Sequence, residues 1–237
     1  MGRKIAVMQP YVFPYLGYFQ LINSVDIFVL YDDVNFIKQG WINRNKILLN
    51  GKESLFTVPI NGVSSFRPIR ETEISGPIYL KWQKKFLKSL RQSYIKAPFF
   101  ENIYPIIETV ILRNHKNIGE LAGDSIQLVS NYLGIDTEFL YSSECFSDSK
   151  SLDKADRLIA IVNELSGDHY INPSGGKELY QKGMFEKAGL KLSFIKNHLR
   201  PYTQLGEEFK AGLSIIDVLM FNDIEEIQKM LTQFELE

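Results

Sequence analysis

The chain has 237 residues, of which 45% are hydrophobic and 13% aromatic, so it can bury a substantial core. Its formal net charge of −1 gives it no global basic field, which argues against nucleic acid as a partner. The single cysteine, Cys145, excludes an intramolecular disulfide and a multi-cysteine metal site, and a reducing compartment fits it best.

The sequence contains no segment with the roughly 20 uninterrupted apolar residues of a membrane-spanning helix. Its first apolar run ends after four residues, at Gln9, and is too short for a signal peptide. We therefore expect a cytoplasmic protein without membrane insertion.

The first part of the chain reads as strands joined by loops and a short helix. Two apolar runs, over residues 4–9 and 26–34, predict buried strands because neither alternates between apolar and polar positions. A loop rich in aromatic residues and about two helical turns over residues 16–25 connect them, which makes a βαβ unit. A third strand is predicted over residues 54–60.

A helical block follows at about residues 77–134. Its apolar residues recur every three or four positions, as on one face of a helix, while Pro98 and Gly134 mark helix ends. The predicted helices cover residues 79–97, 103–112 and 118–133.

Strands and helices alternate again in the rest of the chain. Strands are predicted over residues 137–143, 169–173 and 190–196, and helices over residues 154–165, 214–222 and 224–234. Residues 174–181 are predicted as a glycine turn that leads into a helix. This alternation predicts the α/β class with a mostly parallel sheet. We expect a single α/β domain over residues 1–237, with the helical block packed over the carboxyl edge of the sheet.

Ligands of parallel sheets bind outside the carboxyl ends of the strands, so residues that follow the predicted strands are candidates for a site. The loop after the first strand supplies four candidate substrate-binding residues, which are Gln9, Tyr11, Tyr15 and Tyr18. Buried tyrosine hydroxyls need polar partners, which favours a polar pocket lined by these side chains. The alternative is that the rings of this loop, Phe13 and Phe19 above all, pack against the helical block.

Asp32 and Asp33 end the second predicted strand, and we interpret them as the catalytic residues. Paired carboxylates at a strand end hold a metal, orient a hydroxyl or act as a base. Because no further ligand set accompanies them in the sequence, we predict no metal site and assign them the role of base. The alternative is a solvated turn.

Two other groups of residues have the chemistry of anion-binding sites. Arginine and lysine recognise phosphate, a helix N-terminus attracts it, and glycines let a ligand approach the backbone closely. The first group lies in the segment WINRNK and consists of Trp41, Arg44, Asn45 and Lys46. The second follows the later strands and consists of Ser143, Lys154, Arg157, Ser174, Gly175 and Gly176. The alternative for the first group is an ordinary polar loop, and the glycine turn of the second lacks P-loop spacing.

An ordered set of motifs resembles one known family. The motifs are QPYVFPYLGYF, DIFVLYDDV, NRNKI, TVPI, KADRLI, GGKELY and LSIIDVLMFN, and they lie between residues 5 and 222. This set resembles the WbqC-like family of bacteria, whose members are encoded with O-antigen and other surface-polysaccharide genes. The resemblance implies glycan biosynthesis, with a phosphorylated or nucleotide-linked sugar as the partner.

The beginning of the chain also resembles the nucleotidyltransferases with a HIGH signature. In that signature two histidines contact the nucleotide phosphates, and the segment YLGY places Tyr15 and Tyr18 in their positions. Tyrosine donates a hydrogen bond to phosphate but carries no positive charge. The resemblance implies a Rossmann-like sheet and ATP or another nucleotide as the cofactor.

These observations predict an enzyme of bacterial surface-polysaccharide biosynthesis. The preferred reaction is transfer of an acyl or aminoacyl group to an amino-sugar or nucleotide-sugar. One alternative is a nucleotidyltransferase that acts on a sugar phosphate. The other is a non-catalytic assembly factor that binds glycans or nucleotides.

Overall fold

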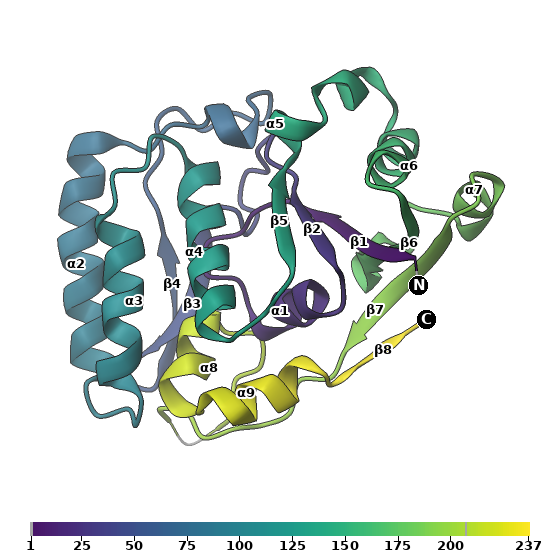
Figure 1. Ribbon diagram of the computed structural model, residues 1–237. Coiled ribbons are helices and arrows are strands. Elements are labelled where there is room, and N and C mark those ends of the chain that lie inside the picture. Colours follow the sequence, from purple (N-terminus) through teal and green to yellow (C-terminus); the bar gives the residue numbers. More distant parts are fainter. Residues whose placement is uncertain (1, 207) are drawn as a thin grey trace.

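A six-stranded, mostly parallel sheet forms the centre of the protein in a computed structural model that describes residues 2–206 and 208–237 (Figure 1). Its strands are β1 (Arg3–Met8), β2 (Ile27–Leu30), β5 (Glu138–Tyr141), β6 (Gly167–Pro173), β7 (Lys191–Asn197) and β8 (Phe234–Leu236). They lie in the order β5-β2-β1-β6-β7-β8, and only β8 runs antiparallel to its neighbour. The five parallel strands therefore have the Rossmann order, whose switch point lies between β1 and β6. The predicted α/β class with a mostly parallel, Rossmann-like sheet is confirmed.

The strands are apolar on both sides because helices cover both faces of the sheet. On one face, Ile5 and Val29 belong to a core cluster that packs under α6 (Lys154–Glu164) and α7 (Lys182–Lys187). On the other, Ala6 and Phe28 belong to a larger cluster that contains residues of α1 (Leu16–Asn23), α8 (Ile215–Phe221) and α9 (Ile224–Leu231). Figure 1 shows α6 and α7 on the opposite side of the sheet from α1, α8 and α9.

Three helices occupy the predicted helical block. They are α2 (Gly76–Tyr94), α3 (Phe100–Leu112) and α4 (Ile118–Tyr132). Figure 1 shows α2 and α3 side by side at one end of the molecule, with α4 between them and the sheet. The N-terminal half of α4 approaches the carboxyl end of β5, because Gly123 contacts the ring of Tyr141. Within the described residues, the chain forms no helix with the length and apolar character needed to span a membrane.

Residues 54–60 differ from the prediction. The strand ends at Thr57 and belongs to a separate antiparallel hairpin of β3 (Arg44–Leu49) and β4 (Lys52–Thr57) instead of the parallel sheet. The physical reason is the turn between them. Asn50 and Gly51 have φ values of 53° and 74°, the left-handed pair that reverses a chain within two residues.

The C-terminal half contains two further differences. The predicted glycine turn is a single 3-10 turn, η3 (Ser174–Gly176), but the helix after it, α7, begins only at Lys182. The predicted last strand, β7, is followed by the antiparallel β8. Three other short elements complete the fold, namely η1 (Ile69–Glu71), α5 (Ser142–Cys145) and η2 (Ser147–Ser151).

Candidate functional site

The parallel strands bring their carboxyl ends to one edge of the sheet. The residues that follow the central strands there are Gln9 after β1, Asp32 after β2, Ser142 after β5 and Ser174 after β6. Sequence reasoning assigned Gln9, Asp32 and Ser174 to the site, and Ser142 directly precedes Ser143, which it also assigned. This edge, next to the switch point, is where Rossmann-like sheets bind ligands.

The carboxylate of Asp32 is held by the turn that follows β5. The hydroxyl of Ser143 donates to Oδ2 at 2.7 Å, while its backbone N–H donates to Oδ1 at 3.0 Å. The Ser142 hydroxyl is 3.2 Å from Oδ1. Asp32 itself is 5% exposed and Ser143 is half-buried. The result is a fixed carboxylate with a partly accessible hydroxyl hydrogen-bonded to it.

Asp33 is held differently, by a buried ion pair. Arg157 Nη2 lies 2.5 Å from Asp33 Oδ2, and the Ser142 hydroxyl donates to Oδ1 at 2.6 Å. Burial alone would raise the pKa of Asp33, but the hydrogen bonds from Arg157 and Ser142 outweigh it and lower that pKa. The guanidinium also lies 4.8 Å from the ring centroid of Tyr31. Asp33 is therefore ionised and engaged by a cation, whereas the partners of Asp32 are serine hydroxyls and a backbone N–H.

The tyrosines of the aromatic loop have different surroundings. Tyr18 is buried, and its hydroxyl donates to the carbonyl of Gln9 at 2.8 Å. Tyr11 is half-buried, with its ring 5.5 Å from that of Tyr18, and burial raises its pKa to about 12. Tyr15 is half-buried and lies 3.4 Å from the Asn197 side chain at the end of β7. Two of the three tyrosines therefore reach the protein surface, and the third packs in the core.

The middle of this loop is part of the core. Phe13 is fully buried in a left-handed conformation, φ 41°, which is costly for a residue with a Cβ. Three segments hold it there. Its N–H donates to Ser125 Oγ at 3.0 Å, and its carbonyl accepts from Asn45 and Ser214, both at 2.7 Å. Phe19 is fully buried as well, in agreement with the packing alternative for these two rings.

Most polar atoms of the segment WINRNK are engaged inside the protein. Arg44 donates to the carbonyls of Gln39 and Gly40, and its guanidinium lies 5.8 Å from the Trp41 ring. Asn45 is buried against the aromatic loop. Lys46 pairs with Glu53 at 2.6 Å. The geometry gives these side chains structural partners and leaves Trp41, 43% exposed, as the member most open to a ligand.

The glycine turn after β6 lies on the far side of the switch point. Gly176 packs so closely on Asn172 that a Cβ there would meet its amide nitrogen at 1.8 Å. Ser174 and Gly175 are exposed, and nothing lies within 4 Å of the place where a Gly175 Cβ would stand. Lys154 is exposed at the first position of α6. These residues remain accessible for a ligand.

Sequence reasoning missed Tyr141, the last residue of β5. Gln127 of α4 donates to its hydroxyl at 3.2 Å, so the phenol still has its own proton to donate. Burial and the nearby charges of Asp32 and Asp124 raise its pKa to about 12. The only sequence signal was its position one residue before Ser142. The geometry makes it a neutral hydrogen-bond donor beside Asp32.

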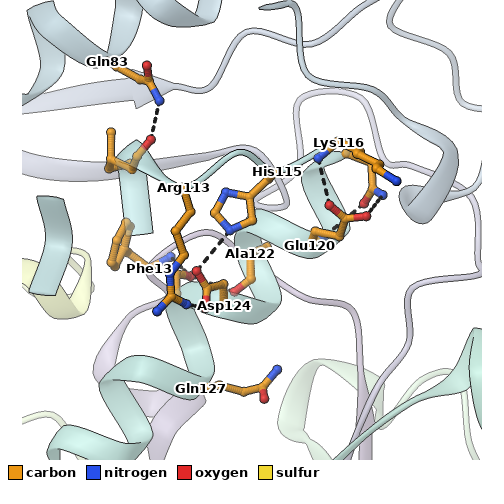
Figure 2. A network of polar contacts seen from close by, with 12 residues as sticks. Phe13, Gln83, Arg113, His115, Lys116, Glu120, Ala122, Asp124 and Gln127 are labelled. Atoms are coloured by element: carbon orange, nitrogen blue, oxygen red, sulfur yellow. Dashed lines mark hydrogen bonds and ion pairs between the residues drawn. The ribbon is translucent and has the colours of Figure 1, made fainter. Parts of the chain in front are cut away.

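A second polar network connects α4 to the residues that precede it (Figure 2). Figure 2 shows Arg113 and His115 pointing toward Asp124, with Gln127 below on the same helix as Asp124. Arg113 Nη1 lies 2.5 Å from Oδ1 of that carboxylate and His115 Nε2 lies 3.0 Å from Oδ2. This network joins the end of α3 to α4. Among residues 2–206 and 208–237, no cluster of three or more histidine, cysteine or acidic side chains is arranged to hold a metal ion.

Comparison with known proteins agrees with the resemblance seen in the motifs. The chain is 30% identical over 224 residues to the uncharacterized protein Rv1507c of Mycobacterium tuberculosis, which covers 93% of this chain and 94% of that protein. No solved structure matches the chain. The model of the WbqC-like protein family matches residues 9–229, and the chain belongs to that family.

Proposed function

We propose that the protein is an enzyme of bacterial surface-polysaccharide biosynthesis that transfers an acyl or aminoacyl group to the amine of an amino-sugar or nucleotide-linked sugar. Membership of the WbqC-like family supports the biological setting. The observation that carries the reaction is the hydrogen bond of 2.7 Å between Ser143 Oγ and Asp32 Oδ2 at the carboxyl edge of the sheet.

The proposed step uses three side chains of this edge. The sugar amine attacks the acyl carbonyl and a C–N bond forms, while the bond from that carbonyl to the donor breaks and the leaving group departs with the electron pair, as the thiolate of an acyl-CoA or as the AMP of an aminoacyl adenylate. The amine proton passes to the Ser143 hydroxyl while the proton of that hydroxyl passes to Asp32. The phenol of Tyr141 donates to the carbonyl oxygen as negative charge develops on it. Asp33 serves in this scheme as the ion-pair partner that positions Arg157.

Nucleotidyl transfer fits the same edge less well. That reaction would need Tyr18 to donate to a phosphate, as the resemblance to the HIGH signature implies. Its hydroxyl proton is instead directed to the Gln9 carbonyl, and its ring is 3% exposed. Acyl or aminoacyl transfer is therefore the preferred reaction. The alternative to test against it is that the protein binds glycans or nucleotides without catalysis.

Product analysis by mass spectrometry tests the proposal. The protein is incubated with UDP-linked amino-sugars and either acyl-CoA donors or ATP plus amino acids. We expect N-acylated sugar, with at least about a hundredfold loss of rate in Asp32→Asn and a smaller loss in Ser143→Ala. Ser147→Ala is the matched control, because this serine lies four residues further on, is exposed, and bonds only the neighbouring Asp148 side chain.

Two outcomes would overturn the proposal. Transfer of a nucleotidyl group to a sugar phosphate would replace it with the nucleotidyltransferase reading. Binding of these compounds without turnover of any of them would favour the non-catalytic assembly factor. Equal activity of Asp32→Asn and the unmodified protein would remove Asp32 from the reaction.

A further inference from the structure

The segment before α2 presents an aromatic side chain to solvent. Phe66 is 91% exposed, the highest value of any large hydrophobic residue in the described part of the chain. Ile37 and Val63 are about half exposed, at 50% and 52%. A single exposed apolar side chain is ordinary, but neighbouring ones form a contact surface.

Backbone hydrogen bonds hold this segment beside the residues that follow β2. The N–H of Phe36 donates to the carbonyl of Arg67 at 2.9 Å, and Asn35 pairs with Pro68 in an antiparallel bridge. Arg67 and Pro68 directly follow Phe66 in the chain. Residues 66–70, called the strip below, are therefore anchored beside the residues that follow β2.

The strip also carries a cation close to the candidate carboxylates. The N–H of Arg70 donates to the carbonyl of Asp32 at 2.9 Å. Its side chain is exposed and, within residues 2–206 and 208–237, forms no ion pair. Arg70 belongs to the 3-10 turn η1, so its Cα lies less than about 14 Å from that of Phe66, four positions earlier in the chain. An exposed ring and the guanidinium of Arg70 therefore belong to one short strip, and the backbone of that strip is hydrogen-bonded to the backbone of Asp32.

We propose that this strip is the nucleotide subsite, in which Phe66 stacks on the base of a nucleotide-linked sugar and Arg70 binds its phosphates. Every nucleobase has a face that stacks on an aromatic ring, and a guanidinium recognises phosphate bidentately. The sugar then extends toward Asp32 and Ser143. The inference rests on the proposed function and deepens it, because it makes the substrate a nucleotide-linked sugar.

Binding of UDP, with ADP, GDP and TDP in parallel, tests the subsite by calorimetry. Phe66→Ala should weaken the binding of the preferred nucleotide by at least about fivefold, and Phe66→Trp should retain it. Pyrophosphate, which has no base, should bind equally to the unmodified protein and to Phe66→Ala, and more weakly to Arg70→Ala. Leu80→Ala is the matched control, since this residue of α2 is 60% exposed and lies outside the strip.

The outcomes separate this subsite from the proposed reaction. The subsite is wrong if Phe66→Ala binds every nucleotide as well as the unmodified protein, or if none of the four binds. It is also wrong if Phe66→Ala loses only affinity for vesicles of anionic phospholipid, which would make the strip a membrane contact. Acylation of a sugar without a nucleotide, unchanged in Phe66→Ala, would refute the subsite and leave acyl transfer standing. Nucleotide binding that depends on Phe66, without turnover of any substrate, would support the subsite and refute acyl transfer.

Discussion

Replacing Arg157 with methionine tests how firmly the buried ion pair holds the carboxyl edge. Methionine keeps most of the apolar stem but leaves the Asp33 carboxylate without its cation. The two side chains are 5% and 3% exposed, so solvent screens the pair little. Removing one partner of a buried pair costs about 3–5 kcal/mol, because an uncompensated charge remains. For a chain of this size that corresponds to a fall in Tm of about 6–20 °C.

The assay is urea unfolding monitored by circular dichroism. It includes two further variants for comparison. In the double variant Asp33→Asn with Arg157→Met no buried charge is left unpaired, so it should lose less than the sum of the single losses, by about 1–3 kcal/mol. Lys154→Met is the control, since this lysine is exposed in the first turn of the same helix. Its effect should stay within about 0.5 kcal/mol.

The pH dependence gives an independent check on Asp33. Its folded pKa is lowered, so the ion pair stabilises the protein above the unfolded pKa of about 4 and this stabilisation is lost as pH falls through the folded pKa. The unfolding free energy of Asp33→Asn should therefore decline less on acidification than that of the unmodified protein. A loss of less than about 1 kcal/mol in Arg157→Met, with the same pH profile in Asp33→Asn, would refute the buried pair.

Three further changes test other parts of the fold by the same unfolding assay. Gly123→Ala places a Cβ 2.2 Å from the Tyr141 hydroxyl and should lower the unfolding free energy by about 1–3 kcal/mol. Adding Tyr141→Phe should recover part of this loss, and an unchanged stability of Gly123→Ala would contradict the contact. Asn45→Ala removes the amide bonded to the Phe13 carbonyl and should cost about 1–3 kcal/mol; no loss would mean that the loop is held by other contacts. Burial raises the pKa of Asp217 despite hydrogen bonds from two tyrosine hydroxyls, so this carboxyl favours folding most at low pH and loses that advantage as pH rises. As pH rises from about 4 to 7, Asp217→Asn should therefore lose less stability than the unmodified protein. An identical pH profile of the two proteins would count against the raised pKa.

Much of the fold could be predicted because its signals are local. The parallel strands are short runs that are apolar on both faces, and the helices repeat their apolar residues every three or four positions. The hairpin of β3 and β4 was harder. The turn at Asn50 and Gly51 can be predicted from the sequence. The strand before it is difficult to predict, because it begins with the polar residues Arg44, Asn45 and Lys46. Which strand a segment pairs with depends on the tertiary structure, and the local pattern does not contain it.

The candidate site could likewise be predicted only in part from the sequence. Strand topology was enough to bring Asp32, Ser143 and the turn at Ser174 to one edge. Sequence reasoning could not tell which polar side chains are already engaged inside the protein, and Arg44 and Asn45 are examples. A residue type states what a side chain can bind. Only the surrounding structure determines whether a partner within the protein already occupies it.

The sheet edge has two sides with different properties, and the proposed reaction uses only one of them. On the α6 side, Asp33 and Arg157 neutralise each other in a buried pair, so neither is free to exchange a proton with a ligand. On the α4 side, Asp32 is hydrogen-bonded to the half-buried Ser143, and the Tyr141 phenol is protonated beside it. In the proposed reaction, the base Asp32, the Ser143 hydroxyl and the neutral donor Tyr141 therefore lie together on the α4 side. The buried pair fixes the turn after β5 through Ser142, which contacts both carboxylates, and so holds Asp32 and Ser143 in the arrangement that the proposed reaction requires.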